Sequence, residues 1–154
     1  PAYVCIVPEK RKEITTEGGL NLSINRNKIK KMISKLKKNK IRTSLFINAT
    51  IKNVLLAKKL NSDCVELHTG KLTDLIKSNK NYFNELNKIK ASSKLARTIG
   101  LEVHAGHGID FKSIKVLNKI NEIEEFNIGH FIIGQSIFDG FKKVIKKFIK
   151  LSKN

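Results

Sequence analysis

The chain has few cysteines and no long apolar run, and these two features limit the classes of protein to which it can belong. Cys5 and Cys64 each lie inside an apolar run and are too far apart in sequence to form a close metal-binding or redox pair. We therefore expect reduced core residues of a cytoplasmic protein rather than a disulfide framework. Runs of roughly eighteen apolar residues, which a membrane-spanning helix needs, are absent from the sequence.

Aromatic and acidic residues are also scarce. Aromatics make up 6% of the chain and do not alternate with its basic runs, which leaves little for stacking on nucleic-acid bases. The 13 acidic residues face 31 basic ones, for a net charge of +18, which suggests an anionic partner. However, 27 of the 31 are lysine, beside 21 Ile and 15 Asn, the set that AT-rich codons supply, whereas groove readers favour arginine. We interpret the charge first as compositional drift and keep a basic nucleic-acid-binding remnant as an alternative.

Short apolar runs alternate with helical patterns along the chain. The predicted strands are residues 3–7, 43–47, 64–68, 101–105 and 126–130. Helical spacing is clearest at Ile29, Met32, Ile33 and Leu36. This alternation predicts an α/β architecture with parallel strands. The segment after the first strand, "PEKRKEITTEGGL", does not match the glycine-rich loop of a doubly wound sheet.

Polar residues follow the predicted strands, as in a TIM (β/α)8 barrel, where functional groups gather at the carboxyl ends. All four histidines are assigned to such ends. The last two strands precede "GHGID" and "GHFIIGQSIFDG", whose glycines suit the phosphate site of a barrel, and the second run is predicted to be a short extra helix ending at Gly140. Five units cannot close the barrel. We interpret residues 1–154 as the C-terminal portion of one barrel domain and expect about 90 residues before Pro1.

Four motifs in this order carry a family resemblance: "VPEKRKEITTEGGL", "VELHTG", "VHAGHG" and "FNIGHFIIG". Over essentially its whole length, the chain resembles the C-terminal five-eighths of the pyridoxine 5'-phosphate synthase family. The resemblance implies condensation of 1-deoxy-D-xylulose 5-phosphate with 3-amino-2-oxopropyl phosphate, closing the pyridine ring with loss of water and phosphate. It also implies no metal or organic cofactor, a cytoplasmic homo-octamer, phosphorylated small molecules as ligands, and neither a specific nucleic-acid partner nor a membrane.

The resemblance also implies roles for single residues. Thr15 would contact the deoxyxylulose phosphate, although a local turn bond is the alternative from sequence alone. Glu66 would stabilise the transition state, the alternative being a salt bridge to Lys10 or Arg11. His107 would be the proton donor. The positions that would bind the amino-oxopropyl phosphate are Gly108, Gly129 and His130, with helix capping as the alternative for His130.

The chain departs from the family pattern at several positions. His104 stands where the family has asparagine, and Gln135 where it has arginine; "HTGKLTD" lacks the tyrosine expected after "HTG". The family's N-terminal portion supplies a further histidine and glutamate and basic phosphate contacts, so we predict that the 154-residue chain alone has no synthase activity. The departures leave an inactive remnant of a phosphate-binding barrel as a second alternative. A third alternative is a zinc or iron site built from His68, His104, His107 and His130.

Overall fold

The computed structural model describes residues 1–8, 18–24 and 26–152, and within these ranges five strands alternate with seven helices. This confirms the α/β class. The elements are β1 (Tyr3–Ile6), α1 (Arg26–Lys38), β2 (Arg42–Asn48), α2 (Ile51–Lys59), β3 (Cys64–His68), α3 (Gly70–Lys77), α4 (Phe83–Thr98), β4 (Glu102–Gly106), α5 (Ser113–Leu117), β5 (Ile123–Asn127), α6 (His130–Asp139) and α7 (Phe141–Ser152). None of the described helices is long and apolar enough to cross a membrane.

The strands form one sheet in which neighbours in sequence are neighbours in space. Its order is β1-β2-β3-β4-β5, and every pairing is parallel. A doubly wound sheet reverses its strand order at a switch point, and the five described strands contain no such reversal. The order is compatible with part of a TIM-type barrel, in which strands follow one another around the axis.

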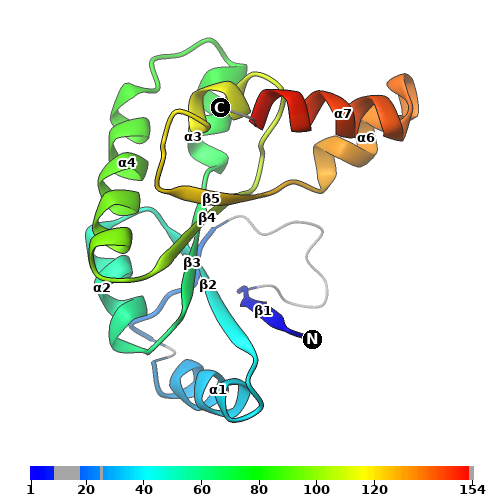
Figure 1. Ribbon diagram of the computed structural model, residues 1–154. Helices are drawn as coiled ribbons and strands as arrows, with labels where there is room; N and C mark the ends of the chain where they lie inside the picture. Colours follow the sequence, from blue (N-terminus) through cyan, green and yellow to red (C-terminus); the bar gives the residue numbers. More distant parts are fainter. Residues whose placement is uncertain (9–17, 25, 153–154) are drawn as a thin grey trace.

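The two faces of the sheet differ in chemistry because side chains alternate along a strand. One face is fully buried and aliphatic, and helices α1, α2 and α4 contact the strands that form it (Figure 1). Its central residues are Leu45, Ile47, Val65, Leu67 and Val103. The opposite face carries mainly polar and sulfur-containing side chains. Its residues include Ser44, Phe46, Cys64, Glu66, His104 and Asn127. Such groups are typical of a functional, ligand-binding surface rather than of a hydrophobic core.

Helices α6 and α7 pack against each other beside β5 (Figure 1). Phe148 of α7 lies 4.7 Å from Phe111 and 5.9 Å from Phe131 of α6, measured between ring centroids. The predicted extra helix is confirmed as α6, which ends before Gly140, a residue with φ of 80°. This aromatic cluster fixes the start of α6 relative to the sheet.

Two details of the sequence reading need correction. The fifth strand ends at Asn127 rather than residue 130, because Gly129 already caps α6 and His130 is its first residue. Helix α3 was not expected, yet Leu72 and Ile76, four residues apart, turn to the core and stabilise it. This helix places additional side chains beside the strand ends.

Candidate active site

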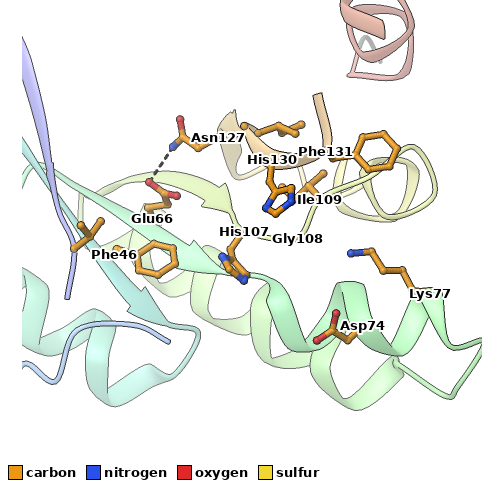
Figure 2. A pocket seen from close by; sticks show the side chains of 13 residues that line it. Phe46, Glu66, Asp74, Lys77, His107, Gly108, Ile109, Asn127, His130 and Phe131 are labelled. Atoms are coloured by element: carbon orange, nitrogen blue, oxygen red, sulfur yellow. Dashed lines mark hydrogen bonds between the residues drawn. The ribbon is translucent and has the colours of Figure 1, made fainter. Parts of the chain in front are cut away.

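A pocket of about 470 Å³ lies at the carboxyl ends of the strands and brings together five of the six residues predicted to form the site. These are Glu66, His107, Gly108, Gly129 and His130. Figure 2 shows the two imidazoles near the centre and the Glu66 carboxylate on the far side from Lys77. The sixth residue, Thr15, lies outside the described residues, as do Lys10 and Arg11, the alternative salt-bridge partners of Glu66.

Glu66 is the buried carboxylate of the pocket. It stands on the polar face of β3, is 8% exposed, and its Oε2 accepts hydrogen bonds from Asn127 Nδ2 at 2.9 Å and from the Cys5 thiol at 3.3 Å. Burial raises its pKa, against these two hydrogen bonds and the nearby His104. The side chain is held in place by donors only, which leaves its charge available to a cationic partner in the pocket.

His107 lies in the turn after β4, in a backbone conformation that few non-glycine residues adopt. Its φ is 78°, and that of Gly108 is 75°. The Thr69 hydroxyl lies 2.8 Å from the carbonyl oxygen of Gly106 and 2.7 Å from that of His107, so both oxygens share its single proton and the turn is held. A side chain at Gly108 would place its Cβ 2.3 Å from Thr73 Oγ1. The tight turn directs the imidazole of His107 into the pocket (Figure 2).

His68, the last residue of β3, supports this imidazole from behind. The two rings stack with centroids 4.7 Å apart, and Gly70 is required beneath them because a Cβ there would lie within 3.0 Å of atoms of both rings. Burial lowers the pKa of His68, and a charge on His107 would lower it further. Two protonated imidazoles would repel at this distance, so His68 favours a neutral state beside its neighbour.

The other side of the pocket is suited to an anion. Gly129 and His130 begin α6, so the positive end of this helix faces the cavity. Gly129 is the capping residue, which removes the capping alternative for His130. Lys77 also lines the pocket, with its ammonium group turned toward the histidines (Figure 2). Phosphate oxygens would find backbone donors and a cation here.

Sequence reasoning missed Lys77 and Asn127, which line this pocket, and Cys5, which binds the pocket residue Glu66. Lys77 was missed because α3, the helix that carries it, was not predicted. Asn127, which binds Glu66, had a detectable signal, since it is a polar residue inside the apolar run before Gly129. Cys5 was interpreted as a core residue, but it is only partly buried and donates to Glu66; Cys64 is buried, as expected. Only the register of β1 reveals that Cys5 lies on the polar face.

No group of possible ligands within the described ranges joins the four histidines, which contradicts the metal site proposed from them. His104 lies inside β4 and not at its end, is 1% exposed, and bonds to the Tyr3 hydroxyl and to Glu102, each at 2.8 Å. The groups of possible metal ligands found within the described ranges include His104 but none of the other histidines. Gln135, the other departure, donates to Asp139 one turn along α6 and does not line the pocket.

Comparison with known proteins agrees with the geometry. The family model described as "Pyridoxal phosphate biosynthesis protein PdxJ" matches residues 1–154. The chain is 59% identical to pyridoxine 5'-phosphate synthase of Pelagibacter ubique (strain HTCC1062) over 99% of its own length and 64% of the relative's. It is 42% identical to the synthase of Zymomonas mobilis over 96% of its own length and 57% of the relative's. The chain therefore spans less than two thirds of these relatives, and it belongs to the PdxJ family of pyridoxal phosphate biosynthesis proteins.

Proposed function

We propose that the full-length protein containing residues 1–154 is a pyridoxine 5'-phosphate synthase. It condenses 1-deoxy-D-xylulose 5-phosphate with 3-amino-2-oxopropyl phosphate to give pyridoxine 5'-phosphate, phosphate and water. The observation that carries the proposal is the single pocket that joins a buried carboxylate, a fixed imidazole and the positive end of a helix. The relatives from Pelagibacter ubique and Zymomonas mobilis are named for the same reaction, which supports the proposal. The nucleic-acid alternative is not favoured, because it gives this pocket no role.

We further propose that residues 1–154 are the C-terminal portion of one eight-stranded barrel. The sequential order of five parallel strands supports this, and so does the greater length of the relatives. A segment on the order of 90 residues would supply the remaining three strands between β5 and β1. The family resemblance extends the proposal to a cytoplasmic homo-octamer that needs no metal or organic cofactor for its reaction.

Each pocket residue has a chemical task in this reaction. The Glu66 carboxylate stabilises the positive charge of an iminium intermediate, which electrostatic pre-organisation in a buried site makes effective. His107 donates a proton to the departing hydroxyl or phosphate. Gly108, Gly129 and His130 hold the phosphate of 3-amino-2-oxopropyl phosphate, with Lys77 as a further cation. In the proposal, Thr15 contacts the other substrate.

Substitutions of Glu66 and His107 test these tasks in the full-length protein. We expect Glu66→Gln to lower kcat by about 10²- to 10³-fold, the usual cost of removing one electrostatic stabiliser. We expect His107→Asn to lower kcat by about 10²- to 10⁴-fold, the contribution of a general acid. The measurement is steady-state formation of pyridoxine 5'-phosphate from the two substrates.

Glu124→Gln is the matched control for Glu66→Gln. Glu124 is also a glutamate, but it lies on the protein surface, where it forms an ion pair with Arg97. We expect this variant to keep the kcat of the unchanged protein. A Glu66→Gln protein that folds and retains full kcat would contradict the role assigned to the buried carboxylate.

A further inference from the structure

A second cluster of reactive side chains extends toward the amino-terminal ends of the strands, and only its innermost member, His104, adjoins the pocket residue Glu66. Cys64 and Glu102 are register partners at the amino-terminal ends of β3 and β4, and His104 follows on the same face. One possible ligand atom of each residue lies within 4.8 Å of the others. His104 Nε2 is 2.8 Å from Glu102 Oε1. This cluster includes His104, the residue that departs from the family pattern, and the proposed reaction does not use it.

We propose that Cys64 Sγ, Glu102 Oε1 and His104 Nε2 bind one zinc ion at a site separate from the pocket. Zinc takes thiolate, imidazole and carboxylate ligands, at about 2.0–2.3 Å. Ligand atoms in a tetrahedral site are then about 3.2–3.8 Å apart, so the present arrangement needs only small side-chain movements. Three protein ligands leave a fourth position for water. The ion would join β3 to β4 at their amino-terminal ends.

The hydrogen bond on the far side of the His104 ring supports this assignment. Tyr3 Oη lies 2.8 Å from His104 Nδ1. When Nε2 ligates a metal, Nδ1 carries the proton and donates to an oxygen, which fixes the ring and its tautomer. Cys64 and His104 are both buried, with exposed fractions of 0% and 1%. Two of the three ligands are therefore already oriented and shielded from bulk water.

The charges around the cluster also favour a cation. Glu102 and Glu125 are carboxylates facing His104, the latter at 3.7 Å from Nδ1. The opposing charge is Arg42, whose guanidinium binds Glu102 Oε2 at 2.5 Å and donates to Cys64 Sγ at 3.4 Å. Arg42 binds Glu102 through Oε2, which leaves Glu102 Oε1 to the metal. The Arg42 side chain is 53% exposed, so it can move away from Cys64 Sγ when zinc binds.

Metal binding must also remove a proton from Cys64. Burial, with the charge of Glu102, raises the pKa of this thiol to about 11, so it is protonated without the metal. On binding, the sulfur–zinc bond replaces the sulfur–hydrogen bond, and the proton passes to solvent.

The experiment is zinc titration of the chelator-stripped full-length protein in competition with a chromophoric chelator. We expect one zinc ion per chain. Cys64→Ser and His104→Asn should each weaken binding by more than about 100-fold, since losing only a partner of a ligand costs about 10- to 100-fold. Cys5→Ser, a control on the neighbouring part of the polar face, should keep the affinity. Cobalt in place of zinc should give a thiolate charge-transfer absorption that Cys64→Ser abolishes.

Circular dichroism of each variant establishes that it is folded. If Cys64→Ser does not fold, His104→Asn decides, because asparagine is the residue expected at this position from the family resemblance. Absence of one-to-one zinc binding by the unchanged protein would overturn the proposal. Unchanged zinc affinity in folded Cys64→Ser or His104→Asn protein would also overturn it, because the zinc would then be bound elsewhere on the surface.

Discussion

The geometry of the pocket depends on a glycine that makes room for its carboxylate. A Cβ on Gly106 would lie 2.0 Å from Glu66 Oε1 and 3.3 Å from the Cβ of Asn127. The missing side chain on β4 therefore lets Glu66 stand upright on β3 and meet Asn127. At the residue scale, the site is defined by close packing as much as by its charged groups.

We predict that Gly106→Ala destabilises the full-length protein by about 1–3 kcal/mol, the usual cost of overpacking a buried position. The added methyl group forces Glu66 away from Asn127, so kcat should fall as well. Urea unfolding measures the first effect. Gly134→Ala in α6 is the control, because nothing lies within 4 Å of its Cβ. It should stabilise the protein by about 0.5–1 kcal/mol. An unchanged unfolding free energy in Gly106→Ala would contradict this packing.

Sequence alone could identify the residues that follow strands, but not the contacts made through strand register. Glu66 and His107 stood out because polar groups directly after apolar strands indicate a site. Cys5 and Asn127 reach Glu66 only because β1 to β5 align in one register. His104 was assigned to a strand end, and only the hydrogen bonding of β4 through Gly106 moves it to the interior of the strand.

Among the elements, α6 and α7 form the unit that supports the anion side of the pocket. Phe148 of α7 packs against Phe111 and Phe131 and is 6% exposed. The same α6 carries Gly129 and His130 at its beginning. Packing of these three rings therefore stabilises the protein and also holds the residues predicted to contact the phosphate in place.

Phe148→Ala should lower the free energy of unfolding by about 3–5 kcal/mol, because it leaves a cavity at the centre of this cluster. It should also raise KM, since the start of α6 loses its support. Phe138→Ala is the matched control: Phe138 lies on α6 with 85% of its surface exposed. Its removal should change stability by less than about 0.5 kcal/mol. Equal effects of the two substitutions, measured by urea unfolding, would contradict the assigned packing.

Periodicity predicted most elements, and local chemistry decided the rest. The pattern of Ile29, Met32, Ile33 and Leu36 indicated α1. Ile29 and Ile33 are buried as expected, whereas Met32 is 40% exposed. Helix α3 was missed because it begins at Gly70, the glycine of the "HTG" motif, which was interpreted only as a site. The end of β5 was misplaced because Ile128 continues the apolar run, while Gly129 already caps the next helix.

For the whole molecule, strand order is the strongest indication of architecture. The sequence favoured a barrel over a doubly wound sheet, and the sequential parallel order of the five strands agrees with that preference. Among the described residues the sheet is open, because β1 and β5 each have only one partner strand. Unpaired strand edges are prone to association.

The central claim is that this pocket belongs to a pyridoxine 5'-phosphate synthase. The most direct measurement is turnover of the two phosphorylated substrates by the purified full-length protein, beside the 154-residue chain alone. We predict that the full-length protein releases pyridoxine 5'-phosphate and inorganic phosphate in equal amounts, and that the chain alone releases neither. A folded full-length protein that forms no pyridoxine 5'-phosphate would contradict the claim.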